Sequence, residues 1–286
     1  MQPIFLDDSA WLDTFLHRVE PLPDEWLMSV LLRCDEANHW TGGTTLHHIL
    51  HPGPEKFHRC WRTETPNLAV IQPSSLNLDY LAQRLSLPAN ALLATTYHTE
   101  LARCYGDDRP LPEYLSPSLS FHLCPACIAE ERMLRRSVIL PHITHCPLHK
   151  VILQKQCSCG IPLRIYHTQS QPFTCHTCGL DWGNLSRIKA SQEQLSREQH
   201  VLSWYEWLFS QGTLRWAAAR IGKFAQQRMY AVNGKIVVKV ETEGSFRKTK
   251  FGSKQRFAWK PLSLSTLVGW LVDANIVPYN FRRSQG

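Results

Sequence analysis

Four short pairs of cysteine and histidine residues fall between residues 124 and 178. The pairs are Cys124 with Cys127, Cys146 with His149, Cys157 with Cys159, and Cys175 with Cys178. Thiolate sulfur and imidazole nitrogen are ligands that zinc prefers, and zinc takes four of them in a tetrahedron. A gap of two residues lets both side chains of one tight turn reach the same ion. The spacing therefore predicts a region that binds zinc.

The order of the pairs indicates how they divide between two ions. We expect one ion to be held by Cys124, Cys127, Cys146 and His149, and a second by Cys157, Cys159, Cys175 and Cys178. Each site then has four protein ligands and no position for water, so both Zn²⁺ ions are predicted to be structural rather than catalytic. Gly160 and Gly179 each follow the second cysteine of a pair, where a positive φ aims backbone N–H groups at sulfur.

Other roles for these residues fit the sequence less well. Ten cysteines without a signal peptide argue against disulfides. The pair Cys157 and Cys159 is one residue shorter than usual, so His167 or His176 could replace a ligand in a distorted site. The remaining histidines near the first site and the remaining cysteines are expected to be ordinary surface or core residues: His122, His142, His145, Cys34, Cys60 and Cys104.

The net charge of +7 is spread unevenly along the chain. Residues 186–286 contain 17 Lys and Arg against 6 Asp and Glu, whereas residues 1–185 contain 14 against 18. A basic third predicts a polyanionic partner, most commonly nucleic acid, although a solvated basic face is the alternative. Residues 246–260 combine six cations and four aromatic residues with no acid, which suits phosphate contact and base stacking. The nucleic-acid-binding residues predicted here are Arg247, Lys248, Lys250, Lys254, Arg256, Trp259 and Lys260.

Two helix pairs are expected before the cysteines. Asp24 can cap or open a helix over residues 25–39, and after Gly42-Gly43 a short helix is expected to run through Ile49. A second pair follows, with Asn77 as the cap, a turn at residues 86–88 and an apolar face that continues to about Tyr97. Both pairs have the outline of a helix-turn-helix. The outward residues of the second pair are polar but hardly basic, which favours protein contact or packing over DNA reading.

Further elements are expected in the rest of the chain. The predicted helices cover residues 9–19, 128–136 (with Arg132, Arg135 and Arg136 exposed), 199–209, 213–228 and 263–274; short strands are predicted over residues 151–153 and 163–166. Asn233-Gly234 lies between two apolar runs, which predicts a hairpin with a type I′ turn.

The fold class predicted from these elements is mainly α with small zinc-stabilised β elements. Three regions are expected: a helical region with helix-turn-helix elements over 1–115, a tandem zinc-binding region over 116–185, and a basic domain of helices and a hairpin over 186–286. The sequence has no signal peptide and no apolar run of 18 residues, so we expect a cytoplasmic protein without membrane contact.

The paired motifs, in this order, resemble the TniQ/TnsD family of transposon target-selection proteins. The residues that carry the resemblance are Pro23-Asp24-Glu25-Trp26-Leu27 and the four ligand pairs, so it covers roughly residues 20–185. The tight pair Cys157 and Cys159 also resembles TniQ proteins of CRISPR-associated transposons, which are bacterial. The resemblance implies a protein that is not an enzyme, with zinc residues that hold the fold.

The resemblance also implies partners. TniQ proteins sit on a guide-RNA effector complex (Cascade), often as a homodimer, and recruit an AAA+ regulator that brings the transposase. TnsD-like members instead bind an attachment site on DNA directly. The length of 286 residues favours the TniQ branch, and the basic C-terminal region favours direct contact with DNA or RNA.

Two readings outside this family are also open. A transcription regulator with helix-turn-helix and zinc modules would use the same residues to read DNA. A zinc nucleobase deaminase would use His98 with Cys124 and Cys127 as ligands and Glu100 as the proton shuttle. The deaminase pattern has Leu123 where a proline is expected, and it gives Cys146 and His149 no role. The identity of the ligand that joins Cys124 and Cys127 therefore separates the readings.

Overall fold

The computed structural model describes residues 17–49, 76–105, 122–140, 142–165, 170–210, 229–232, 235–241, 257–261 and 264–273. The chain divides into two compact units. The first comprises Met1–Thr99 and Pro117–Gln199, and the second comprises Glu100–Ser116 and His200–Gly286. The three regions expected from the sequence remain a prediction. The helices and short cysteine-rich turns of the first unit, and the small sheet of the second, agree with the predicted class of mainly α structure.

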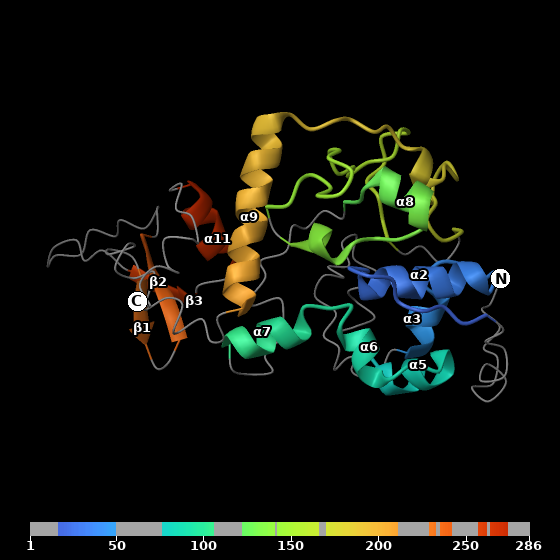
Figure 1. Cartoon of the computed structure of the whole chain (residues 1–286), viewed down its shortest axis with the longest axis horizontal. Coiled ribbons are helices and arrows are strands. Elements are labelled where there is room, and N and C mark those ends of the chain that lie inside the picture. Colours follow the sequence, from blue (N-terminus) through green and yellow to red (C-terminus); the bar gives the residue numbers. More distant parts are fainter. Residues whose placement is uncertain are drawn as a thin grey trace, which may run out of the picture. The chain divides into compact units, whose positions relative to one another are not determined.

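Among the described residues, four helices form the first part of unit 1 (Figure 1). They are α2 (Leu27–Ala37), α3 (Thr44–Ile49), α5 (Leu78–Leu85) and α6 (Ala89–Leu93). Helix α3 lies against both α2 and α5, and α5 packs on α6. Both predicted helix pairs are therefore present. The second is shorter than expected, because α6 ends at Leu93 rather than near Tyr97.

Local hydrogen bonds set the beginnings of these helices. The side chain of Asn77 accepts a hydrogen bond from the backbone N–H of Tyr80, so the predicted cap of α5 is confirmed. Asp24, in contrast, is not the cap of α2. Its φ is 58°, and Trp26 occupies the cap position. Helix α3 begins against a side chain from α2, since Asp35 accepts hydrogen bonds from the N–H groups of Gly43 and Thr45 at 2.7 Å each.

The cysteine-rich part of unit 1 has little regular structure. It contains α8 (Pro125–Glu131), the 3₁₀ turns η4 (Arg136–Ile139) and η5 (Trp182–Asn184), and the start of α9 (Gln192–Ser210). The expected helix over 128–136 begins three residues earlier, because Pro125 occupies its first turn and Arg132 ends it with a φ of 52°. The short strands predicted here are reduced to isolated bridges such as His145 with Ile152.

One core joins the helices to the cysteine-rich part of unit 1. Fully buried side chains come from α2, α3 and α5 (Leu31, Leu46 and Leu81). Others come from the cysteine-rich part (Phe173 and Trp182). Cys157 and Cys175 belong to the same core. Burial of apolar surface contributes about 25 cal/mol per Å², so the metal-binding turns and the helices stabilise each other.

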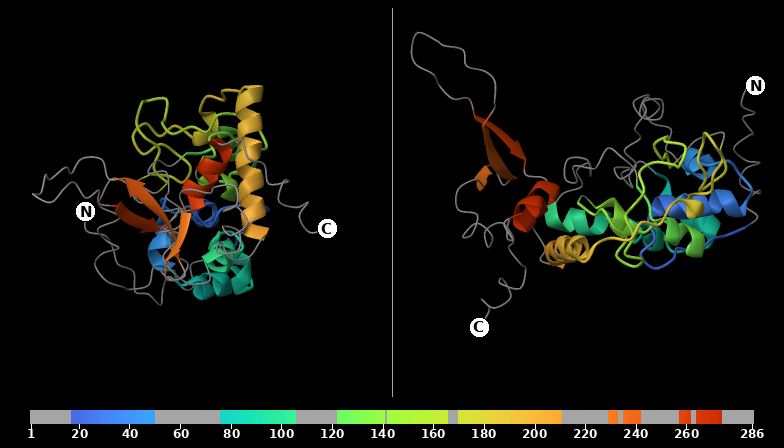
Figure 2. Two further views of the ribbon diagram at one scale, coloured as in Figure 1. Left: turned by 90° about the vertical axis from the view of Figure 1, so that its left-hand side faces the viewer. Right: turned by 90° about the horizontal axis from the view of Figure 1, so that it is seen from above.

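Unit 2 contains the only sheet among the described residues. Strands β1 (Met229–Val232), β2 (Lys235–Glu241) and β3 (Phe257–Pro261) are antiparallel in that order, side by side in both views of Figure 2. Val232 pairs with Lys235, which confirms the predicted two-residue hairpin. The third strand was not predicted. Helix α11 (Leu264–Asp273) matches the last predicted helix, and α9 begins seven residues before the predicted helix. The helices predicted over 9–19 and 213–228 lie largely or wholly outside the described residues.

Helix α7 (His98–Tyr105) begins at the end of the first segment of unit 1, and from Glu100 onward it belongs to unit 2. In the described part of the chain, no helix is both long enough and apolar enough to cross a membrane.

Candidate metal centres

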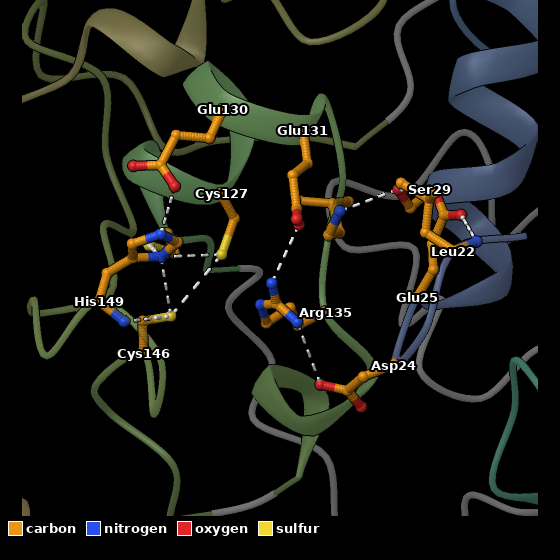
Figure 3. A network of polar contacts seen from close by, with 12 residues as sticks. Leu22, Asp24, Glu25, Ser29, Cys127, Glu130, Glu131, Arg135, Cys146 and His149 are labelled. Atoms are coloured by element: carbon orange, nitrogen blue, oxygen red, sulfur yellow. Dashed lines mark hydrogen bonds and ion pairs between the residues drawn. The ribbon is translucent and has the colours of Figure 1, made fainter.

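The first cluster is built from one helix start and one tight turn. Cys124 is the N-cap of α8 and Cys127 lies in its first turn, so both side chains leave the same end of the helix. Cys146 and His149 come from a turn closed by two backbone hydrogen bonds: Cys146 N–H to the carbonyl of Val151 at 2.8 Å, and Lys150 N–H to that of Cys146 at 2.9 Å. Figure 3 shows Cys127, Cys146 and His149 pointing toward one another.

The distances in this cluster match a tetrahedral zinc site. Nδ1 of His149 lies 3.5 Å from Sγ of Cys124, 3.3 Å from Sγ of Cys127 and 3.5 Å from Sγ of Cys146. The sulfurs of Cys127 and Cys146 are 3.7 Å apart. A tetrahedron with Zn–S bonds of about 2.3 Å and a Zn–N bond of about 2.0 Å has S···S edges of about 3.8 Å and S···N edges of about 3.5 Å. The four ligand atoms are therefore already placed for one ion.

Helix α8 also orients the histidine of this cluster. The Oε2 atom of Glu130 lies 2.8 Å from Nε2 of His149, on the far side of the ring from the sulfurs (Figure 3). A carboxylate on the second nitrogen fixes the tautomer, so that Nδ1 carries a free lone pair toward the metal. Sequence spacing did not indicate Glu130. Its position three residues after Cys127 on a helix was the available signal.

The surroundings of Cys146 favour its thiolate form. Hydrogen bonds from the thiols of Cys124 and Cys127 lower the pKa of Cys146 to about 2. The backbone N–H of His149 also points at the same sulfur, at 3.5 Å. Because the thiolate is the form that binds metal, these hydrogen bonds favour the binding of a metal ion at Cys146.

The second cluster consists of Cys157, Cys159, Cys175 and Cys178. The sulfurs of Cys157 and Cys178 are 3.5 Å apart, and those of Cys159 and Cys175 are 3.8 Å apart. These distances fit the same tetrahedron, so the short spacing of the first pair does not prevent closure. Each cluster brings its four ligand atoms within 4.8 Å of one another. Cys157 and Cys175 are buried, whereas Cys159 and Cys178 are exposed.

Three of the four ligand pairs are followed by a residue in the same left-handed backbone conformation. The residue after the second ligand has a positive φ in each: 56° at Lys150, 82° at Gly160 and 72° at Gly179. This confirms the conformation predicted for the two glycines. Lys150 adopts the same conformation with a side chain, at a cost of about 1 kcal/mol that the closed turn must offset.

Three arginines that the sequence predicted to be exposed are instead structural contacts. Arg132 donates to the carboxylates of Glu36 on α2 and Asp181, the latter at 2.6 Å, and its guanidinium lies over Phe173 at 4.9 Å. Arg135 lies between Glu131 and Asp24 (Figure 3), and Arg136 donates to the carbonyls of Ala94 and Thr96. The prediction of an exposed face was wrong because all three residues lie beyond the last residue of α8, where the chain turns back onto unit 1.

The other candidate histidines lie outside the clusters. Buried His145 contacts Glu198 of α9, with Nδ1 2.6 Å from Oε2, and its backbone N–H also donates to that carboxylate.

His98 lies on α7, and Cys146 rather than His98 joins Cys124 and Cys127. His176 is not a member of the second cluster, and Cys34 is buried. His167, Cys60 and the side chain of Cys104 lie outside the described residues. The ligand set thus departs from the deaminase pattern.

The predicted nucleic-acid-binding residues are only partly described. Arg247, Lys248, Lys250, Lys254 and Arg256 lie outside the described residues. Trp259 and Lys260 lie on β3, opposite Lys239 and Val238 of β2, and only their backbone is described. Their role in nucleic-acid binding stays a prediction.

Comparison with known families was made on the whole chain. The sequence model of the TniQ family matches residues 16–153. These residues, just under half of the chain, form a TniQ domain. The match spans the helix pairs and the whole first metal cluster, and it ends before the second cluster. The TniQ domain supports a role in transposition, as an adaptor or in target selection. A comparison with curated proteins gave no match.

The extent of the TniQ match agrees with the contacts in unit 1. The N–H of Trp26 donates to the carbonyl of Leu134 at 2.9 Å, and that of Leu134 to Oγ of Ser29 at 2.8 Å. Glu25 forms a bridge with Arg135 across the same boundary. The start of α2 and the segment after α8 are therefore paired, and the helices and the first metal cluster of the TniQ domain form one folded unit.

Proposed function

We propose that this protein is a non-enzymatic adaptor that links a target-bound complex to an AAA+ transposition regulator. The observation that carries the proposal is that each of the two clusters brings four ligand atoms together, in a chain that contains a TniQ domain. Eight protein ligands fill two tetrahedra, which leaves no coordination position for a substrate. Such sites support a rigid surface rather than a reaction.

Zn²⁺ is the ion that we assign to both clusters. Three sulfurs with one nitrogen, and four sulfurs, are the donor sets of structural zinc. Cys124, Cys127, Cys146 and His149 would hold the first ion, and Cys157, Cys159, Cys175 and Cys178 the second. Binding of the ions stabilises the folded chain, since the ligands come together only on folding.

The target-bound complex that we favour is a guide-RNA effector complex of the Cascade type, bound by a TniQ homodimer. One sequence feature supports this branch, namely the tight pair Cys157 and Cys159. The test is co-purification of the full chain with the effector complex and with the AAA+ regulator of the same transposon. Guide-dependent capture of both supports the adaptor. Capture of neither overturns it.

Direct selection of a DNA site, as in TnsD-like proteins, is the second candidate. The basic residues 246–260 favour it. This activity predicts that the protein alone binds one duplex sequence at least about a thousandfold more tightly than others, as specific DNA readers do. Replacement of Lys248, Lys250 and Lys254 by Ala is expected to weaken DNA or RNA binding uniformly across sequences if the stretch contacts only phosphate.

A further inference from the structure

The two metal clusters differ in the exposure of their cysteines. All three cysteines of the first cluster are buried, whereas Cys159 and Cys178 of the second are exposed. The residues beside these two cysteines in the chain are exposed as well: Ser158, Gly160, Thr177 and Gly179. Among the described cysteines, Cys159 and Cys178 are therefore the ones that a dissolved oxidant reaches most easily.

Each exposed cysteine lies beside a buried cysteine of the other turn. Sγ of Cys178 lies 3.5 Å from Sγ of Cys157, and Sγ of Cys159 lies 3.8 Å from Sγ of Cys175. In both pairs one cysteine is exposed and its neighbour belongs to the core of unit 1. A thiolate that is oxidised first and a second thiolate in contact with it are the two parts that disulfide formation needs.

The donor set of the second cluster also favours its reaction with oxidants. Four thiolates around Zn²⁺ carry a formal charge of about −2, whereas three thiolates and one imidazole carry about −1. The greater negative charge leaves more electron density on the sulfurs, which are the nucleophiles in oxidation. In the first cluster His149 stands in place of a fourth thiolate, and Glu130 holds its ring. Both differences favour oxidation of the second cluster before the first.

We propose that the second cluster is an oxidation site for hydrogen peroxide. The proposal rests on the assignment of zinc to this cluster, and it needs no partner protein or nucleic acid. Oxidation joins the two turns by a disulfide between Cys157 and Cys178, between Cys159 and Cys175, or by both. The thiolates that remain are too few to complete a tetrahedron, so the ion is released. The first cluster, whose cysteines are buried, keeps its ion.

The reaction consumes one peroxide for each disulfide. The sulfur of the exposed thiolate attacks one peroxide oxygen, the O–O bond breaks, and the other oxygen leaves as hydroxide and takes a proton. The exposed cysteine is then a sulfenic acid. The buried thiolate attacks its sulfur, the S–O bond breaks, and the second hydroxide takes a proton. Two thiolates, one hydrogen peroxide and two protons thus give one disulfide and two waters, and the sulfurs lose the two electrons that the peroxide gains.

The position of the second cluster limits the change to one part of unit 1. The TniQ domain ends at residue 153, before the first ligand of this cluster. Thr174, beside Cys175, pairs with Asp181, whose carboxylate accepts a hydrogen bond from Arg132 at 2.6 Å. We expect release of the second ion to loosen this contact while the ligands of the first cluster stay together. Oxidation thus acts on the segment after the TniQ domain.

The test treats the full chain, loaded with two zinc ions, with increasing amounts of hydrogen peroxide, and catalase stops each reaction. Native mass spectrometry counts the ions retained per chain, and peptide mapping after alkylation identifies the disulfides. The expected result is the loss of one ion together with a disulfide that joins residues 157–159 to residues 175–178. Dithiothreitol with added zinc is expected to restore the second ion, because disulfide formation is reversible.

A matched variant removes the exposed thiols and keeps a zinc-binding donor set. Cys159→His with Cys178→His leaves two cysteines and two histidines, which is also a donor set of structural zinc. This double variant is expected to retain both ions at peroxide doses that remove one ion from the parent. Thr177→Ala changes an exposed residue of the same turn that is not a ligand, and it is expected to behave like the parent.

The outcomes decide for or against the oxidation site. Loss of one ion with a disulfide between the turns in the parent, and no loss in the double variant, supports the proposal. Retention of both ions by the parent overturns it. So does earlier loss of the first cluster's ion, a disulfide confined to one turn, or oxidation of the second cluster to sulfinic or sulfonic acid without a disulfide.

Two further results separate this proposal from the zinc assignment and from the adaptor function. If the double variant binds only one ion, the disulfide map of the parent decides alone. Fewer than two ions in the parent before peroxide is added would overturn the zinc assignment, and this proposal with it. The adaptor function is tested independently, by co-purification with the effector complex and the AAA+ regulator.

Discussion

Glu130 Oε2 lies 2.8 Å from Nε2 of His149, so helix α8 both supplies ligands of the first cluster and orients a third one. Cys124 and Cys127 lie at the beginning of that helix, and Glu130 lies one turn after Cys127. The ligands from the helix and the ligand from the turn are thus linked twice, through the ion and through the carboxylate. This arrangement makes the position of α8 dependent on metal binding.

Removal of the Glu130 carboxylate is expected to weaken the first site only. Glu130→Gln replaces the charged acceptor of the His149 ring with a weaker, neutral amide, and such partners of a metal ligand are worth about 10- to 100-fold in affinity. Competition with a chromogenic chelator measures the effect. Glu131→Gln is the matched control, because Glu131 contacts Arg135 instead. Equal affinities in the two variants would show that the contact does not act on the metal.

Cys146→Ser is expected to reduce the bound metal from two ions per chain to one and to lower the melting temperature. The physical reason is that folding and structural metal binding are coupled. His98→Ala is the comparison that matters, since a deaminase-type site would need His98 and not Cys146. Elemental analysis after gel filtration is the measurement. Retention of two ions by Cys146→Ser, or loss of one by His98→Ala, would refute the ligand set.

The second cluster is expected to react with thiol reagents before the first. Cys159 and Cys178 are exposed, whereas all three cysteines of the first cluster are buried. Susceptibility of thiolates follows their exposure. Timed alkylation with N-ethylmaleimide, followed by peptide mass spectrometry and release of zinc to a dye, gives the order. Modification of Cys127 or Cys146 ahead of Cys159 would contradict the burial that the fold assigns to the first cluster.

Asp35 is expected to make stability depend on pH. Burial raises the pKa of Asp35 to about 6 from 3.8, although hydrogen bonds from Thr45 and Gly43 oppose the rise. Because the folded pKa exceeds the unfolded one, the folded chain binds more protons between these values, and the contribution to stability is lost as the pH rises through about 6. From pH 5 to pH 7 the loss is about 1 kcal/mol.

Urea unfolding of the parent and of Asp35→Asn at both pH values isolates this effect. Asparagine does not titrate, and any change in metal binding affects both chains alike. Between pH 5 and pH 7 the parent should lose about 1 kcal/mol of stability relative to Asp35→Asn. A difference that is constant, or that moves the other way, would show that Asp35 keeps an ordinary pKa in the folded chain.

The features that the sequence predicted correctly depend on neighbours in the chain. Asn77 caps α5 through a residue three positions away, and the Asn233-Gly234 turn joins adjacent strands. The glycine conformations at 160 and 179 follow from the tightness of each turn. Spacing alone also identified all eight members of the two clusters, because ligand pairs in a turn leave a local pattern.

The features that the sequence did not predict depend on residues far apart in the chain. Arg132 contacts Glu36, which lies 96 positions away in the sequence, and His145 contacts Glu198, which lies 53 positions away. A basic residue near the end of a helix is usually solvated, so the helical periodicity of the sequence predicted an exposed Arg132. Glu25 and Asp35 are charged residues inside the core, each held by hydrogen bonds that only the fold brings into place.

Metal content is the most direct measure of the central claim, that eight side chains close around two ions and leave no coordination site open. The full chain should be purified without added metal, then measured by native mass spectrometry and by elemental analysis. Two zinc ions per chain, both resistant to gel filtration, are the predicted result. One ion or none per chain, or an exchangeable water on either bound metal, would contradict the account.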